Sequence, residues 1–151
     1  MSIANSLQRL GLVLPPVPKS LSSYVPATRT GNLIFTSGQI PLLDGVLISP
    51  GKVGDLISLE KAGESAILCC LNALAAISSL VSLEEIQKIV KLGVYVASVP
   101  EFTDQHLVAS HPSDLLLKVF GEKGKHSRFA IGVASLPINA CVELELLVEV
   151  K

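Results

Sequence analysis

Residues 128–137 read RFAIGVASLP, and residues 141–145 read CVELE. Both runs have the apolar, β-branched composition of strands, and a short break rich in Pro and Asn separates them. The first run begins with Arg128, and the second carries Glu143 near its start. We expect the two strands to be neighbours, so that a fixed cation and a fixed carboxylate form a small-molecule site.

Arg128 allows two interpretations from the residues alone. It is either a surface arginine at the start of a strand, or its guanidinium binds a substrate carboxylate through two hydrogen bonds. Because side chains alternate between the faces of a strand, Arg128 shares a face with Ala130, Gly132 and Ala134. These small neighbours leave space above the sheet, as a ligand or another subunit requires.

Glu143 also has two interpretations. It alternates with buried positions and shares a face with Glu145 and Glu149, which is typical of a solvated acidic stripe. The other interpretation is a functional carboxylate in the same site as Arg128. Ser37, next to Gly38, is a candidate hydroxyl donor.

Working outward, the chain reads as strands, helix, strand, helix and two final strands. Helical spacing predicts a long, mostly buried helix that begins after Ser58 and runs to about Leu80. A strand occupies the first part of residues 33–41, a hairpin turns at residues 44–45, and a second strand covers 89–96. Residues 104–110 form a helical turn, and Pro112 begins a further helix that ends at Gly121. This order predicts an α+β fold with a mixed sheet and helices on one face.

We divide the chain into an N-terminal extension, residues 1–19, and a single domain, residues 20–151. The extension contains a short helix over residues 2–10 and a Pro-rich segment over 14–18. Residues 20–26 are predicted as a loop that includes Tyr24.

Composition narrows the classes of partner. Apolar residues make up 49% and charged residues 17% of the 151 residues, and mean hydropathy is +0.56. So few charges on a small domain predict that another copy covers part of the surface. The net charge of −1 argues against a nucleic-acid partner. Neither a signal peptide nor a membrane-length apolar run is evident, so we expect a cytoplasmic protein, with a short organellar presequence as the alternative.

The sequence contains no recognisable metal-binding or cofactor-binding motif. The histidines, at positions 106, 111 and 126, form no HExxH motif and share no helix face. Dinucleotide-binding and phosphate-binding glycine loops are also missing from the sequence. The three cysteines, Cys69, Cys70 and Cys141, have no disulfide-framework spacing and are expected to be buried free thiols. We therefore expect neither a metal nor a cofactor.

Four blocks, taken together and in order, resemble the YjgF/RidA family of small trimeric reactive intermediate deaminases. They are Tyr24 with residues 31–41 (GNLIFTSGQIP), the long helix with Asn72, the strand 89–96 with residues 100–102 (PEF), and residues 128–137 with 142–145. The resemblance covers roughly residues 20–150. It implies a chorismate-mutase-like α+β fold with two main helices on one face of a mixed sheet, and a homotrimer with clefts between subunits.

The resemblance also implies roles for individual residues. Arg128 matches the arginine that binds the carboxylate of an amino-acid-derived enamine or imine, and Glu143 matches the glutamate that positions the hydrolytic water. Tyr24 and Ser37 match residues that line the same cleft, and Gly38 matches a glycine that lets the chain pass close by. The implied partner is a small carboxylate-bearing substrate or a 2-oxo acid.

The chain departs from the best-studied members at three places around Arg128. Ala130 stands where a cysteine is common in the substrate cleft, Gly132 stands where an acidic residue is frequent, and the segment 103–112 is longer. These features resemble a longer branch of the family. Two other functions remain open: a non-catalytic metabolite-binding or chaperone-like trimer, and RNA cleavage, which the near-neutral charge makes weaker.

Overall fold

The computed structural model of the chain describes residues 1–20 and 22–151. Leu21, within the predicted loop 20–26, lies outside the described residues, and the remainder of that loop is irregular, as expected. In the described part of the chain, no helix is both long enough and apolar enough to cross a membrane.

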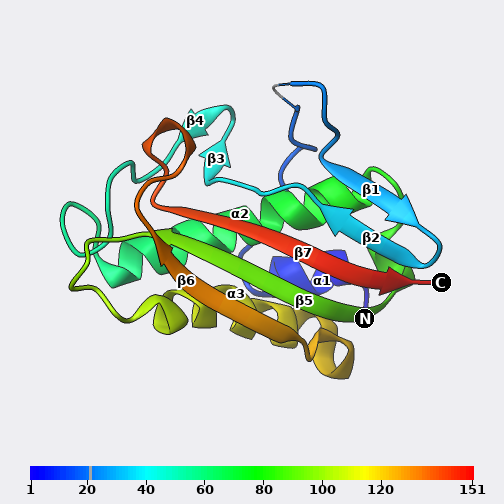
Figure 1. Cartoon of the computed structure of the whole chain (residues 1–151). Coiled ribbons are helices and arrows are strands. Elements are labelled where there is room, and N and C mark those ends of the chain that lie inside the picture. The colour runs from blue at the N-terminus through cyan, green and yellow to red at the C-terminus, as the bar shows by residue number, and fades with distance from the viewer. Residues whose placement is uncertain (21) are drawn as a thin grey trace.

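The centre of the molecule is a five-stranded mixed sheet (Figure 1). Its strands are β1 (Ala27–Thr30), β2 (Leu33–Thr36), β5 (Ile86–Ala97), β6 (Ser127–Val133) and β7 (Val142–Val150). The order across the sheet is β1-β2-β7-β5-β6. The β5–β6 pair is parallel, whereas the other neighbours are antiparallel. Strands β3 (Leu42–Leu43) and β4 (Val46–Leu47) form the separate hairpin predicted around Asp44 and Gly45.

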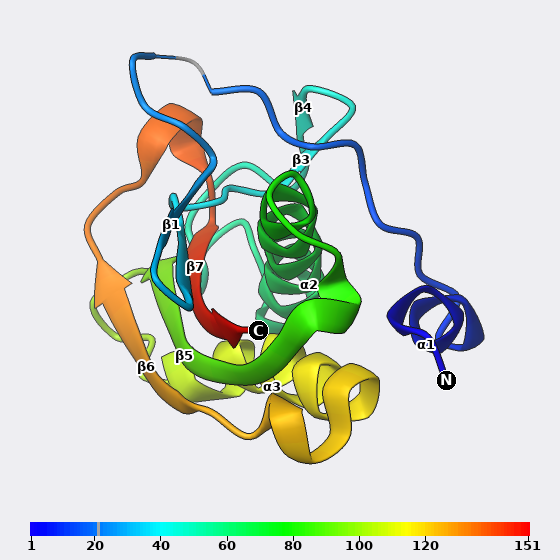
Figure 2. The ribbon, with the colours of Figure 1, turned by 90° about the vertical axis from the view of Figure 1, so that its right-hand side faces the viewer.

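Helices α2 (Leu59–Ser78) and α3 (Gln105–Phe120) lie side by side on one face of the sheet (Figure 2). The short helix α1 (Ile3–Arg9) contacts α3 on the side away from the sheet. The described residues also contain 3-10 turns at η1 (Leu83–Glu85), η2 (Gly121–Gly124) and η3 (Pro137–Asn139). The predicted α+β class, with two main helices on one face of a mixed sheet, is confirmed.

Helix α2 begins where the sequence indicates. The Ser58 hydroxyl accepts the Lys61 backbone N–H at 3.1 Å, and Glu60 lies in the first turn, where the helix dipole favours a carboxylate. Its buried side chains pack against the sheet and against α3. The core then consists of this helix, the inner side of α3, and the inward-facing residues of β5 and β7, such as Val94 and Leu144.

Helix α3 corrects one prediction. Instead of a helical turn followed by a second helix at Pro112, a single helix runs from Gln105 to Phe120 with Pro112 inside it. Proline removes the N–H that would bond the Val108 carbonyl, a cost that usually ends a helix. Here buried residues on both sides of Pro112, among them Val108 and Leu116, hold the two halves together in one helix.

The order of strands corrects a second prediction. β6 and β7 follow one another in sequence but are not neighbours, because β5 lies between them. Helix α3 connects β5 to β6 as the crossover of a parallel pair, and β7 returns on the other side of β5. Strand β1 was also missed, since residues 27–30 were not assigned to any element. The strand-like run 128–137 is a strand only as far as Val133.

Candidate functional site

Glu143 lies on the face of the sheet opposite to α2 and α3. In β7, Val142, Leu144 and Leu146 point into the core, whereas Glu143 and Glu145 alternate with them and are half-buried. Glu143 pairs across the sheet with Tyr95 of β5. The carboxylate therefore stands on a surface that is partly apolar and only partly hydrated.

The chain after β2 passes directly over Glu143. A β-carbon on Gly38 would lie 2.9 Å from the Glu143 carboxyl carbon. Gln39 pairs with Leu144 through two backbone hydrogen bonds of 2.7 and 2.9 Å, which hold this segment against β7. The close passage of the chain that the family resemblance implies at Gly38 is present, and the group approached is the Glu143 carboxylate.

Ser37 and Tyr24 lie on the same side of the site as Gly38. The Ser37 hydroxyl donates to the Val25 carbonyl at 2.6 Å, and the Ser37 N–H donates to the Pro26 carbonyl at 2.8 Å. These bonds join the loop that carries Tyr24 to the segment that carries Gly38. Tyr24 is half exposed. The fold thus brings four of the predicted site residues, Tyr24, Ser37, Gly38 and Glu143, to one end of the sheet.

The surroundings of Glu143 favour its protonated form. Burial raises the pKa of the Glu143 carboxyl above its usual value, and the nearby Glu145 charge raises that pKa further. The Tyr95 hydroxyl donates to Glu145 Oε1 at 3.1 Å. Burial, together with Glu145 and Glu143, also raises the pKa of Tyr95. A carboxylate whose pKa is shifted toward neutrality is suited to accept a proton from a water molecule.

Arg128 lies on the opposite face. It pairs with Leu92, whose side chain is fully buried on the helix side of the sheet. Its guanidinium donates to the Ser113 hydroxyl at 3.0 Å and to the His106 carbonyl at 3.2 Å, both in α3. Within the described residues, these two bonds use two of the five guanidinium N–H groups. Three N–H groups remain for other acceptors.

The expectation that Arg128 and Glu143 act side by side on neighbouring strands is wrong for a single chain. Their partners on β5, Leu92 and Tyr95, are three residues apart, and β5 separates the two strands. This spacing corresponds to about 10 Å along the strands and about 10 Å across the sheet. The two side chains also leave the sheet in opposite directions. In this structure Arg128 and Glu143 of one chain therefore do not face a common site.

The space expected above the small residues of β6 is only partly present. Ala130, on the same face as Arg128, packs against the core. A cavity of about 440 Å³ lies farther along, where Gly132 and Ala134 face Ser98 and Gln105. Arg128 does not line this cavity.

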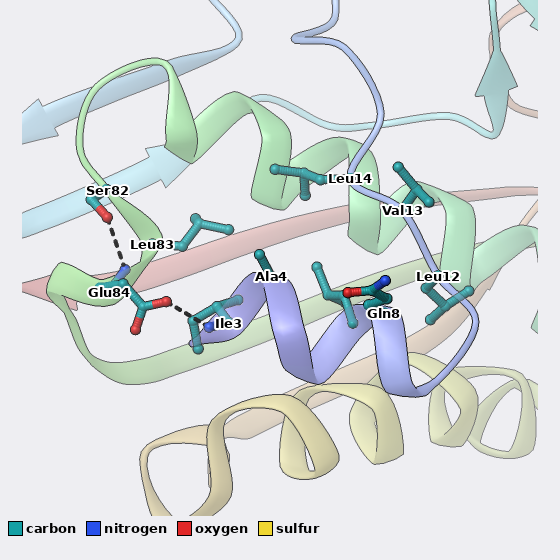
Figure 3. A pocket seen from close by; sticks show the side chains of 10 residues that line it. Ile3, Ala4, Gln8, Leu12, Val13, Leu14, Ser82, Leu83 and Glu84 are labelled. Carbon is teal, nitrogen blue, oxygen red and sulfur yellow. Dashed lines mark hydrogen bonds between the residues drawn. The ribbon is translucent and has the colours of Figure 1, made fainter. Parts of the chain in front are cut away.

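Another cavity, of about 490 Å³, lies between α1 and η1 (Figure 3). Its walls are mainly apolar and include Leu7, Leu12, Leu14 and Leu83. In Figure 3 the Glu84 carboxylate accepts a hydrogen bond from the Ile3 N–H, which ties the start of α1 to η1. None of the predicted site residues lines this cavity.

Three residues near Glu143 and Arg128 were not singled out as functional from the sequence. They are Tyr95, which pairs with Glu143 across the sheet, Ser113, which bonds Arg128, and His126, which bonds Ser113. For Tyr95, the position on a strand beside Glu143 was a usable signal, since cross-strand partners meet on one face. For Ser113 and His126, sequence spacing to Arg128 contains no such signal.

The cysteines are buried free thiols, as expected. Burial raises the pKa of Cys70 to about 12, and it also raises the pKa of Cys69 and Cys141. These thiols remain protonated at neutral pH and are therefore poor nucleophiles.

Comparison with known proteins agrees with the fold. The family described as "YjgF/chorismate_mutase-like, putative endoribonuclease" matches residues 5–150. Protein TCP17 of Trypanosoma cruzi is 39% identical over 99% of this chain and 94% of its own length. The crystal structure of Atu1372 from Agrobacterium tumefaciens is 41% identical, with a TM-score of 0.93 over 99% of this chain and 94% of that one.

A more distant structure, E. coli TdcF with bound serine, has a TM-score of 0.61 at 20% identity, over 91% of this chain and 94% of that one. At this identity the likeness concerns the fold alone. The family match spans nearly the whole chain, and the residue blocks that suggested the family lie within it. The chain belongs to the YjgF/RidA family.

Proposed function

We propose that the protein is an enamine/imine deaminase that hydrolyses reactive imines derived from amino acids to 2-oxo acids and ammonia. The observation that carries the proposal is the Glu143 carboxylate, half-buried beneath Gly38 and with a raised pKa. Such a group is poised to remove a proton from water at neutral pH. A cytoplasmic location belongs to the same proposal, and cell fractionation tests it.

The atoms and charges of the reaction balance with water as the co-reactant. An enamine first becomes an iminium ion by taking a proton on carbon. Water attacks the iminium carbon while Glu143 takes one of the water protons, and the electrons of the C=N bond move to nitrogen. The carbinolamine nitrogen then takes that proton, the C–N bond breaks to release ammonia, and an oxygen lone pair forms the C=O bond. The hydroxyl proton passes to the departing ammonia. The products are a 2-oxo acid and ammonium.

Arg128 is proposed to bind the substrate carboxylate, and its three remaining N–H groups fit a carboxylate with two bonds. Because Arg128 and Glu143 of one chain leave opposite faces of the sheet, the proposal needs a second copy. We propose a homotrimer in which Arg128, with Ala130 beside it, faces the Tyr24, Ser37, Gly38 and Glu143 cluster of the next subunit. Light scattering tests this assembly, and a monomer would contradict it.

Ammonia release from an imine generated in situ by an amino-acid oxidase tests the activity. We expect the wild-type protein to accelerate ammonia release, and Arg128→Ala and Glu143→Gln each to lower the rate by about 100-fold or more. Arg29→Ala is the matched control, because Arg29 bonds only to the Gly31 and Lys151 carbonyls in the described chain. A wild-type rate no higher than that of Arg128→Ala would exclude the catalytic function.

Two other functions give different results in the same samples. A non-catalytic metabolite-binding or chaperone-like trimer would bind 2-oxobutyrate but release no ammonia. RNA cleavage, which the family description names, predicts salt-sensitive RNA binding. The net charge of −1 and the Glu143–Glu145 pair disfavour a polyanion near this site.

A further inference from the structure

A chain of hydrogen bonds reaches Arg128 from the end of α3. The Gly124 carbonyl lies next to His126 Nδ1 at 2.6 Å, His126 Nε2 lies 2.9 Å from the Ser113 hydroxyl, and that hydroxyl accepts from Arg128 Nη1 at 3.0 Å. Ser113 is only 8% exposed. These groups come from η2, the segment before β6, the middle of α3 and β6.

The direction of each bond in this chain follows from chemistry. A carbonyl oxygen only accepts, so His126 Nδ1 carries the proton that bonds Gly124. In the neutral imidazole Nε2 then has a lone pair and accepts the Ser113 hydroxyl proton. A guanidinium only donates, so the Ser113 oxygen accepts from Arg128. With a neutral His126 ring every partner is matched in this arrangement, and the Ser113 hydroxyl proton then points to His126 Nε2.

The start of this chain is held rigidly. Gly124 is buried, and a β-carbon there would lie 2.9 Å from the Leu116 carbonyl carbon and 3.1 Å from the Leu117 α-carbon. Both atoms are backbone of α3, so residue 124 packs directly on that helix and only glycine fits. The Gly124 carbonyl is thereby placed relative to α3, and His126 is placed by that carbonyl.

We propose that Ser113 and His126 are positioning residues that hold the Arg128 guanidinium ready for a substrate carboxylate. Ser113 acts directly on Arg128, and His126 acts through Ser113. The second anchor, the His106 carbonyl, bonds Arg128 Nη2 at 3.2 Å. An arginine side chain has many rotamers, and fixing it before a ligand arrives lowers the entropy lost on binding. This inference rests on the proposed role of Arg128 as carboxylate anchor.

Calorimetric binding of 2-oxobutyrate to the full-length protein measures the effect. We expect Ser113→Ala and His126→Phe to weaken binding by about 10-fold or more, since each removes a bond that supports a charged donor. Ser113→Thr keeps the hydroxyl and restores affinity. Ser78→Ala is the control, because the Ser78 hydroxyl bonds only the Ala75 carbonyl of its own helix. In ammonia release, KM rises in Ser113→Ala and kcat changes less.

Nitrogen NMR tests the positioning independently of activity. The neutral His126 ring is expected to carry its proton on Nδ1, and the Arg128 Nη signals are expected to be separate because both nitrogens are held. Ser113→Ala should merge the Nη signals, and Ser113→Thr should keep them apart.

The outcomes of the two measurements are distinct. In one outcome the wild-type protein binds no 2-oxobutyrate but gives the expected NMR pattern. This result would exclude Arg128 as the carboxylate anchor, but it would still support the positioning of Arg128. Wild-type binding that Ser113→Ala leaves unchanged, or a His126 proton on Nε2, would overturn the positioning inference while the proposed function stands.

Discussion

Gly38 and Glu143 are in such close contact that a β-carbon on residue 38 would lie 2.9 Å from the Glu143 carboxyl carbon and closer still to its Oε1. Gly38 is not among the glycines with positive φ. The requirement for glycine here therefore comes from the carboxylate and not from the backbone conformation. The two residues are 105 positions apart in sequence, and the backbone pairing of Gln39 with Leu144 brings them together.

Gly38→Ala is expected to inactivate the protein without unfolding it. The atoms that a β-carbon would meet belong to the end of a flexible side chain, which can rotate away. We expect a change in stability of about 1 kcal/mol or less and a fall in ammonia release of about 100-fold. In a Glu143→Gln background, Gly38→Ala should lower ammonia release little further, because both changes remove the same function, that of the Glu143 carboxylate. Losses that multiply in the double variant would contradict this relationship.

Glu145→Gln is expected to shift the pH profile of ammonia release. Glu143 acts as a base in its ionised form, so the rate falls as the pH drops through its pKa. The Glu145 charge contributes to raising that pKa. Removing the charge lowers the pKa, and the acidic limb of the profile should move to lower pH. Both proteins are measured in the same buffers. If the acidic limb lies at the same pH in both, the pKa of Glu143 does not determine that limb.

The stability of the protein should also report on Glu143. Its pKa is raised in the folded state, so the folded chain binds a proton more tightly than the unfolded chain does. This contribution is present at pH values below the usual pKa of a glutamate and is lost as the pH rises through the raised pKa. Glu143→Gln should therefore raise Tm relative to wild type at neutral pH more than at acidic pH. Equal differences in Tm at both pH values would argue against a raised pKa.

Ile131→Glu is expected to dissociate the proposed homotrimer. Ile131 pairs with Tyr95 on the sheet face that carries Glu143, and 46% of its surface is exposed in the single chain. If this face is covered by another copy, a new carboxylate on the same face as Glu143 would lose its water. Light scattering should then give the mass of a monomer. Leu117→Glu is matched in exposure, at 41%, but lies on α3 and should leave the mass unchanged.

Asn72→Leu is expected to destabilise the fold. Asn72 is 4% exposed, and its side-chain amide donates to the Ile40 and Leu42 carbonyls at 3.4 and 3.0 Å. The substitution leaves both carbonyls without this donor and should lower the free energy of unfolding by about 1–3 kcal/mol. Urea denaturation measures the loss, with Ser79→Ala, at the C-cap of the same helix, as a control. A variant as stable as wild type would show that water replaces the amide.

The elements that the sequence predicts well are those set by local chemistry. Helix α2 has a serine cap and an unbroken apolar pattern, and the hairpin β3–β4 has Asp44 and Gly45 at its turn, both with positive φ. The alternation of β7 also placed Glu143 on the face away from the core. The same pattern could not show that α3 continues through Pro112, because tertiary packing on both sides of the proline outweighs its local cost.

The sequence by itself determined the residue types of the candidate site, the α+β class and the family, because short-range patterns and ordered motifs carry that information. Only the tertiary structure decided which residues meet. Strand β5 separates Arg128 from Glu143 because a parallel crossover places β6 at the edge of the sheet. The same crossover brings α3 over β6, so that Ser113 bonds Arg128. Long-range strand pairing set both relationships, and neither can be inferred from spacing along the chain.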